Sequence, residues 1–166
     1  MTGKKFNMDN KLFLSFILNS SKYAIDISYV IEIKSFDELN LLPLSGPPYV
    51  KGCVIFRDKI TPIIDLEVIY QQKGVSFLSR DSIIFVLVEE EYIGIITKGI
   101  PNIIELSEDN ISFDKLDNSL EEKGIKAIGI YYDEPYYIID LAKLLLNNEV
   151  GAYRGENGTD KSIDYR

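Results

Sequence analysis

The segment Val50–Leu66 reads VKGCVIFRDKITPIIDL, and the segment Ile125–Leu141 reads IKAIGIYYDEPYYIIDL. In both, a mostly apolar run is followed by a short polar turn, a second apolar run and the sequence Ile-Ile-Asp-Leu. Two runs rich in Ile, Val, Phe and Tyr on either side of a short turn predict a β-hairpin. The same hairpin is therefore expected twice in this chain.

A second pair of segments repeats nearer the start of each half. Leu14–Leu18 followed by Tyr23–Ile27 corresponds to Ile83–Leu87 followed by Tyr92–Ile96. The two pairs define two copies of a β unit of roughly 60–70 residues, too long a period and too few copies for a solenoid. Because no linker flanks either copy, we expect two similar small barrels that pack against each other.

The apolar periodicity along the chain is mostly two residues, which is typical of strands. Short helical turns are expected at Leu66–Tyr70 and Leu141–Leu146. The fold class is therefore predicted to be mainly all-β, a barrel or sandwich. The predicted strands are Lys11–Leu18, Lys22–Ile27, Tyr49–Phe56, Ile60–Ile64, Ser82–Val88, Tyr92–Thr97, Ile125–Tyr131 and Tyr136–Ile139.

The composition limits the chemistry available to this chain. It has 166 residues, a formal net charge of −8, one cysteine and no histidine. Without histidine, this chain has no Ser-His-Asp or Cys-His catalysis and no imidazole metal ligand, and we expect no metal and no cofactor. Cys53, in an apolar run, is interpreted as a small core residue in a reducing compartment. The acidic balance disfavours nucleic acid as a partner.

The start of the chain has some likeness to a secretory signal, because lysines precede the apolar run Leu12–Leu18. Asp9 among the lysines, and the lack of a small-residue cleavage site, favour a first β-strand instead. No segment approaches the roughly 18 apolar residues of a membrane span. We therefore expect a cytoplasmic protein without direct membrane insertion, and a disordered tail at 149–166.

Asp65 and Asp140 occupy the same position in the two copies, and a carboxylate pair from related halves is the arrangement of aspartic proteases. Those enzymes have Thr-Gly after the aspartate, whereas Leu follows both residues here. The alternative is that each Asp caps the helical turn beginning at Leu66 or Leu141. The sequence favours the caps, and a β-barrel enzyme that uses both carboxylates stays as a second hypothesis.

Two charges stand out in apolar surroundings. Glu32 lies inside Val30–Ile33, and Arg57 follows Val54–Phe56. A charge beside an apolar strand is either solvated or faces a partner next to an apolar groove, and Arg is frequent at such contacts. The residues themselves leave both interpretations open.

Several short motifs follow one another in a particular order: Phe16-x-Leu18, Tyr23–Ile27, Val30-x-Glu32-Ile33, Leu42-Pro43, Val50-x-Gly52, Phe56-Arg57 and Thr61–Leu66. Their order and spacing resemble the CheW-type chemotaxis coupling proteins, over about Leu12 to Leu146. The resemblance implies a CheW-like domain at 11–148 with two intertwined five-stranded SH3-like barrels. It also implies a non-enzymatic adaptor that couples the cytoplasmic tips of methyl-accepting chemoreceptors to the regulatory domain of the histidine kinase CheA. Such adaptors work in membrane-associated signalling arrays. A CheW-like scaffold in a non-chemotaxis two-component pathway is the alternative.

The resemblance also implies a receptor-binding groove and assigns no residue to the kinase. Glu32 matches the glutamate of the family's V-x-E-I stretch, Arg57 matches the arginine of its R-G turn, and Ile100 matches an apolar position from the second barrel. The implied groove residues are Val30, Glu32, Gly52, Arg57 and Ile100.

Two positions depart from the family pattern. Asp58 stands where the family has the glycine of its Arg-Gly turn, and Lys98 stands where many members have Asp. Asp tolerates the left-handed backbone better than most residues, so the turn is expected to form. The charge reversal at Lys98 is expected to alter partner choice, as in a divergent paralogue.

Overall fold

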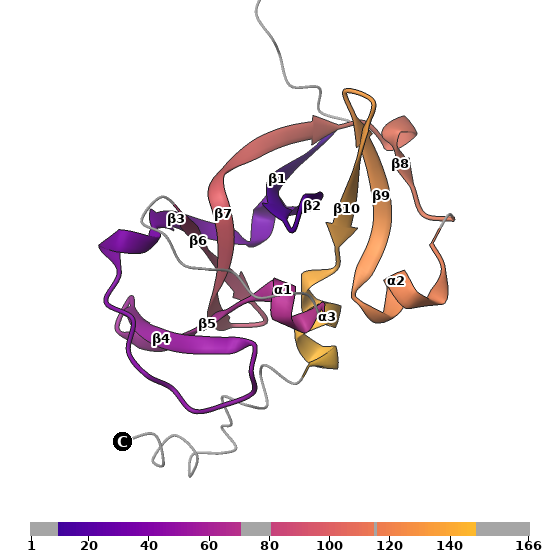
Figure 1. The fold of residues 1–166 in the computed structure, drawn as a ribbon. Coiled ribbons are helices and arrows are strands. Elements are labelled where there is room, and N and C mark those ends of the chain that lie inside the picture. Colours follow the sequence, from indigo (N-terminus) through magenta and orange to yellow (C-terminus); the bar gives the residue numbers. More distant parts are fainter. Residues whose placement is uncertain (1–9, 71–80, 115, 149–166) are drawn as a thin grey trace, which may run out of the picture.

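The structure is a computed structural model that describes residues 10–70, 81–114 and 116–148. The expected tail at 149–166 lies outside this part of the chain. The described residues form ten strands, three short α-helices and three 3₁₀ turns, and their arrangement is drawn in Figure 1. In chain order these are β1 Lys11–Leu18, β2 Ser21–Asp26, η1 Ile27–Tyr29, β3 Val30–Ser35, η2 Phe36–Glu38, β4 Val50–Phe56, β5 Lys59–Ile64, α1 Leu66–Ile69, β6 Ser82–Val88, β7 Glu91–Leu106, η3 Glu108–Asn110, β8 Ile111–Ser112, α2 Asn118–Glu122, β9 Ile125–Tyr131, β10 Glu134–Ile139 and α3 Leu141–Asn147.

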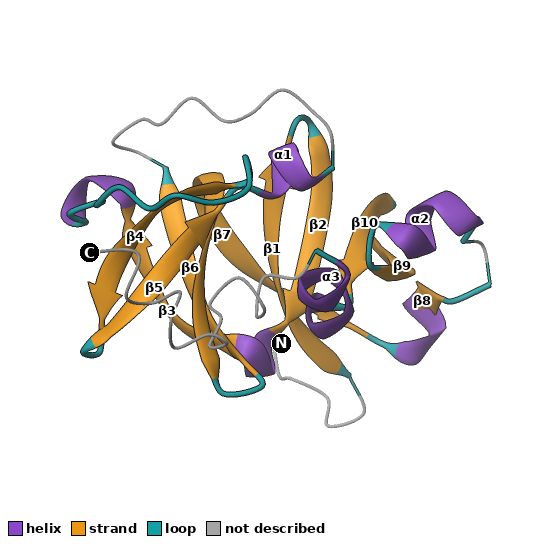
Figure 2. Cartoon of the chain, turned by 90° about the horizontal axis from the view of Figure 1, so that it is seen from below, coloured by secondary structure: helices purple, strands orange, loops and turns teal. Residues whose placement is uncertain are grey.

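The strands form two small barrels joined by one long strand. The β4 barrel has the strand order β3-β6-β7-β5-β4, and the β9 barrel has the order β7-β1-β2-β10-β9 with the short β8 added to β9. The long strand β7 passes from the first barrel into the second, arching across the top of Figure 1. Figure 2 shows α3 between the two groups of strands.

Each barrel takes strands from both copies of the repeat. The last strand of the first copy, β5, runs parallel to β7 of the second copy, with Ile63 opposite Gly94. In the same way β10 runs parallel to β2, with Ile138 opposite Ala24. The two barrels are therefore intertwined, and the prediction of paired SH3-like barrels in a mainly β fold is confirmed.

The predicted correspondence between the two copies of the repeat is wrong by one residue for the β1–β2 and β6–β7 hairpins. The β1–β2 hairpin closes at Leu18 and Ser21, and the β6–β7 hairpin closes at Val88 and Glu91. Leu18 therefore corresponds to Val88, whereas the sequence comparison paired it with Leu87. These strands are buried on both faces, so a shift of one residue leaves the apolar pattern nearly unchanged.

Three of the eight predicted strands have the predicted bounds, and four others end within two residues of them. The eighth, Tyr92–Thr97, covers only the first part of β7, which continues through Gly99 and Pro101 to Leu106. The structure accommodates them in a bulge: pairing with β1 shifts register between Ser15 and Ile17, and Gly99 has φ +67°. β3, β8 and α2 were not among the predicted elements.

Both predicted helix caps are present. The Asp65 side chain accepts the backbone N–H of Glu67 at 2.9 Å, and that of Asp140 accepts the N–H of Lys143 at 3.1 Å. Leu66 and Leu141, which follow, are fully buried in the core shared by the barrels. Each carboxylate thus has the structural role that the sequence favoured. Cys53 is buried as predicted, and burial raises the pKa of its thiol.

Glu67 is a buried acid on α1 whose Oε2 accepts the backbone N–H of Asn19 at 2.8 Å. Burial raises the pKa of this carboxyl above its usual value, against the opposing effect of that hydrogen bond. As pH rises from the unfolded-state pKa of about 4.5, the unfolded chain releases its proton first. The free energy of unfolding therefore falls until the folded-state pKa is passed.

We expect Glu67→Gln to remove this fall, because a neutral side chain keeps the acceptor for Asn19 and has no charge to bury. The measurement is urea unfolding from pH 4 to 8. Glu90→Gln, at an exposed hairpin turn, is the control for loss of the same charge. Parallel stability curves for Glu67→Gln and the wild type would contradict the assignment.

Candidate functional site

A groove of about 380 Å³ opens where the two edge strands of the β4 barrel, β3 and β4, face each other. Leu42, on the connection between them, pairs with Cys53 and covers that part of the β4 edge. Beyond Cys53, the residues Val54–Phe56 line the groove instead. The residues that line it are Glu32, Lys34, Glu38, Leu39, Asn40, Leu42, Val54, Ile55, Phe56, Arg57 and Phe85.

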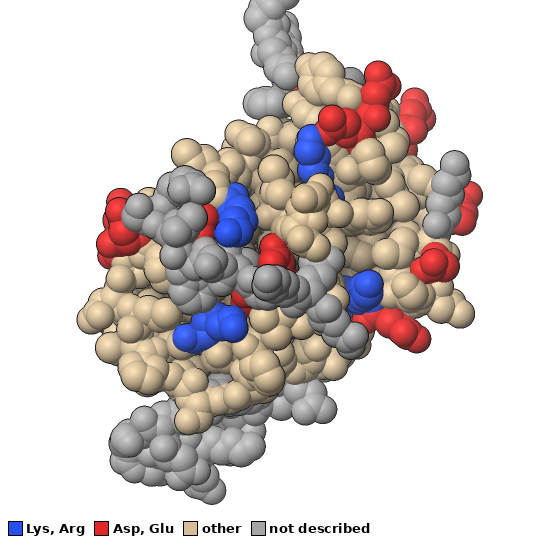
Figure 3. All heavy atoms as spheres, viewed as in Figure 1, with Lys and Arg blue, Asp and Glu red and all other residues tan. Residues whose placement is uncertain are grey.

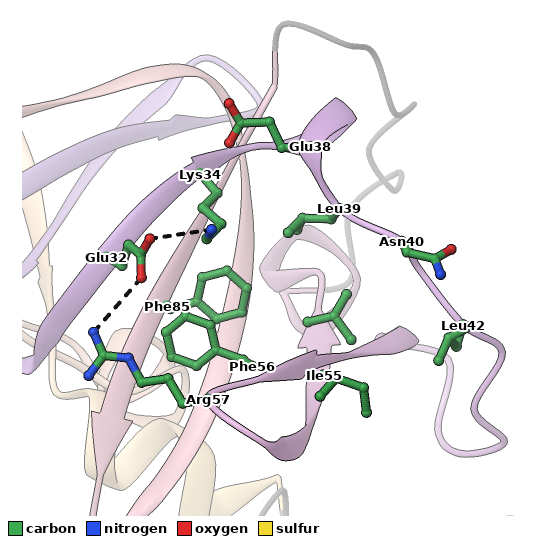
Figure 4. A pocket seen from close by; sticks show the side chains of 11 residues that line it. Glu32, Lys34, Glu38, Leu39, Asn40, Leu42, Ile55, Phe56, Arg57 and Phe85 are labelled. Atoms are coloured by element: carbon green, nitrogen blue, oxygen red, sulfur yellow. Dashed lines mark ion pairs between the residues drawn. The ribbon is translucent and has the colours of Figure 1, made fainter.

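Two stacked aromatic rings form the floor of the groove. The rings of Phe56 and Phe85 lie 4.1 Å apart between centroids, with 2° between their planes, and both residues are buried. Tyr92 packs edge-on against Phe56 at 5.2 Å. Beside this floor Ile55 exposes 60% of its surface, so the groove combines a rigid aromatic base with an aliphatic wall (Figure 4).

The rim of the groove carries a shared carboxylate. Glu32 Oε1 lies 3.8 Å from Arg57 Nη2, and Glu32 Oε2 lies 3.4 Å from Lys34 Nζ. The Arg57 guanidinium also lies 5.2 Å from the centroid of the Phe56 ring. All three charged side chains are 36–52% exposed, and a ligand can reach them. Figure 4 shows Glu32 between the two cations.

Arg57 and Asp58 form the two-residue turn of the β4–β5 hairpin. Their φ angles are +52° and +66°, the left-handed conformation of a type I′ turn. The turn therefore forms with Asp58 where the family has glycine, as expected. Tyr132 and Asp133 make the equivalent turn in the β9–β10 hairpin with φ angles of +51° and +64°.

Asp58→Gly is expected to raise the free energy of unfolding by about 0.5–1 kcal/mol, because glycine adopts a positive φ without steric strain. The measurement is chemical denaturation. Asp133→Gly is the matched control in the equivalent turn and should stabilise by a similar amount. A loss of stability in either variant would show that the aspartate side chain supports the turn.

The other implied groove residues lie behind or away from the groove. Val30 begins β3, half-buried against the shared core. Gly52 is buried, and a Cβ there would lie 2.6 Å from the backbone oxygen of Leu42, so Gly52 shapes the wall from behind. Ile100 is 79% exposed on the β7 bulge and lines a separate pocket of about 160 Å³ beside Lys98. The structure thus brings together Glu32 and Arg57 alone of the five.

Sequence reasoning missed Lys34 and the aromatic floor. The spacing of Glu32 and Lys34, two residues apart on one strand, could have placed both on one face. Phe85 had no such signal, because it comes from the other copy of the repeat through the pairing of β3 with β6.

A second pocket of about 440 Å³ lies on the β9 barrel, lined by Phe13, Ile138 and the 64%-exposed Phe113 among others.

On the face drawn in Figure 3, Lys and Arg side chains are scattered. Within 10–70, 81–114 and 116–148, no group of three potential metal ligands is found. No helix there is both long and apolar enough to cross a membrane.

Intertwined small barrels with an aromatic-floored groove between two edge strands suit the binding of a protein segment. Residues 12–149 match the model of the CheW-like domain, and the chain belongs to this family. It is 29% identical over 139 residues to the chemotaxis protein CheW of Klebsiella aerogenes, covering 83% of each chain. The probable chemotaxis protein CheW of Rhizobium etli is 22% identical over 147 residues, covering 88% of this chain and 94% of that one.

A solved structure has the same fold. The scaffolding protein TtCheW from Thermoanaerobacter tengcongensis superposes with a TM-score of 0.69 at 23% identity, covering 81% of this chain and 92% of that chain. The family consists of non-enzymatic scaffold proteins, and the chain is one of them.

Proposed function

We propose that this protein is a chemotaxis adaptor that links the cytoplasmic tips of methyl-accepting chemoreceptors to the regulatory domain of the histidine kinase CheA. Membership of the CheW-like family and the chemotaxis names of its relatives support this proposal. The observation that carries it is the groove between β3 and β4, with its aromatic floor and charged rim. Residues 11–148 act as the binding domain, which its partners recruit to membrane-associated arrays.

The groove suits one face of a helix from a receptor tip. An amphipathic helix would lay its apolar side chains on Ile55 and the aromatic floor, while Arg57, with Glu32 beside it on the rim, fixes its register through charge. Gly52 contributes by letting Leu42 approach β4 closely, since a side chain there would displace the wall. Val30 contributes by holding the start of β3 against the core.

Ile100 extends the proposed receptor contact beyond the groove. It lies on the β7 bulge, at the passage from one barrel to the other. A long helical hairpin that rests on the groove and also reaches Ile100 would bury an aliphatic side chain that is 79% exposed. Ile100→Ser should therefore weaken receptor binding less than a change at Arg57.

The test is binding of the purified chain to two separate fragments: a chemoreceptor signalling tip and the CheA regulatory domain. Titration calorimetry should give saturable binding to each, and both together should co-elute with the chain in one complex. If neither fragment binds, the adaptor role fails. If only fragments from a receptor and kinase outside chemotaxis bind, the chain serves another two-component pathway.

A further inference from the structure

Glu32 is one carboxylate facing two cations. Its Oε1 faces the Arg57 guanidinium at 3.8 Å, and its Oε2 faces the Lys34 ammonium at 3.4 Å. Lys34 lies two residues from Glu32 on β3 and therefore on the same face of that strand. Because Lys34 approaches more closely and from the opposite side, it competes with Arg57 for the charge of Glu32.

The Arg57 side chain is held in place, but its guanidinium N–H donors are available to a ligand. Its backbone is fixed by the left-handed turn, and its guanidinium lies over the Phe56 ring at 5.2 Å. The contact with Glu32 at 3.8 Å is an ion pair beyond hydrogen-bond length. Among the described residues no hydrogen bond from this guanidinium is recorded, and the side chain is 52% exposed. A guanidinium in this state can bind a carboxylate through two parallel N–H donors.

We propose that Lys34 sets the availability of Arg57: by holding Glu32, it leaves the guanidinium free to receive a carboxylate from the partner that docks in the groove. This rests on the proposed function of the groove and names the chemistry of its occupant. The occupant is a protein segment that carries an Asp or Glu side chain next to an aliphatic one. The carboxylate meets Arg57, and the aliphatic side chain packs on Ile55, which is 60% exposed.

Charge complementarity supports this occupant. With Glu32 paired to Lys34, the end of the groove at the β4–β5 turn presents a cation above an aromatic ring. An acidic side chain would form an ion pair with Arg57 there, and the partial exclusion of water from the groove would strengthen that pair. A basic side chain at the same point would instead face Arg57 and be repelled.

The first test needs no partner. Phenylglyoxal labelling of Arg57, followed by peptide mass spectrometry, measures how free the guanidinium is. Lys34→Gln should slow the labelling about three- to tenfold, because Glu32 then pairs with Arg57 alone, and Glu32→Gln should accelerate it. The matched control is Lys59→Gln: Lys59 is exposed next to the same turn, opposite Phe56, so its loss removes the same charge without freeing Glu32. Equal labelling rates in the wild type and Lys34→Gln would overturn the proposal.

The second test uses the receptor signalling-tip fragment and a double-mutant cycle. Lys34→Gln should weaken binding about three- to tenfold, more than Lys59→Gln, and Glu32→Gln/Lys34→Gln should return to within about twofold of wild type. In an Arg57→Ala background, Lys34→Gln should have no further effect. A persistent effect of Lys34→Gln without Arg57 would overturn the proposal. Failure of the wild type to bind would overturn the adaptor function instead, while the labelling test still decides the role of Lys34.

Discussion

Arg57→Glu is expected to weaken binding of the chemoreceptor tip by about 100-fold while leaving the fold intact. The change replaces the cation at the groove rim with a second carboxylate near Glu32, and like charges at an interface are unfavourable by several kcal/mol. The fold should tolerate it because Glu89, at the same position of the β6–β7 turn, already adopts φ +50°. Glutamate is therefore compatible with the backbone that position 57 requires.

The measurement for Arg57→Glu is titration calorimetry against the receptor fragment, with thermal unfolding in parallel. Lys59→Glu, which makes the same charge reversal on the next strand beside the turn, is the control and should reduce affinity by less than about fivefold. Arg57→Lys should be intermediate, because an ammonium keeps the charge but not the paired donors. Wild-type affinity in Arg57→Glu would move the receptor site away from this groove.

The repeat made the architecture predictable, but not which strand closes which barrel. The hairpins at Val50–Leu66 and Ile125–Leu141 are visible because each has an apolar run, a turn and a helix cap in a fixed order. That β5 pairs with β7 depends on contacts between residues about thirty positions apart, such as Ile63 and Gly94. Local sequence patterns do not indicate which distant strands pair with each other. The intertwined arrangement came from the family resemblance instead.

The candidate site, like the fold, could be predicted from the sequence only in part. Glu32 and Arg57 were identified because each is a charge in an apolar motif, and the structure places them within one ion pair. Gly52 and Ile100 came from the same resemblance, yet one lies behind the groove and the other on a bulge. A motif gives the position of a residue in the chain, whereas bulges and close backbone approaches decide where its side chain points.

Two small residues, Gly94 and Ala24, lie at the parallel strand pairs that close the two barrels. A Cβ on Gly94 would lie 2.5 Å from Cδ1 of Ile63 and 3.0 Å from Cγ2 of Ile83. Ala24, at the corresponding position of β2, is fully buried opposite Ile138. Small residues on one strand of each parallel pair thus make room for the isoleucine of the other. In the β4 barrel, Ile63 belongs to the same core cluster as Phe56 and Phe85, the two rings on which the groove rests.

Phe85→Ala is expected to lower the free energy of unfolding by about 3–5 kcal/mol, the range for loss of a buried aromatic side chain. Phe85 is fully buried in the core of the β4 barrel and stacks on Phe56 at 4.1 Å. Because a domain of this kind has a total stability of about 5–15 kcal/mol, the loss is a large part of it. Urea unfolding monitored by circular dichroism measures it directly. A shift in the midpoint at constant slope would indicate a change in stability alone.

Two further variants separate packing from binding. Phe85→Leu keeps most of the volume and should lower stability by less than Phe85→Ala, by about 1–2 kcal/mol, because the ring stack is lost but the cavity is small. Phe113→Ala, at a side chain 64% exposed on the other barrel, should change stability by less than about 0.5 kcal/mol. Since Phe56 and Phe85 also form the groove floor, folded Phe85→Leu should bind the receptor fragment more weakly than Phe113→Ala does. Equal binding by the two variants would mean that the partner rests on the rim charges and not on the floor.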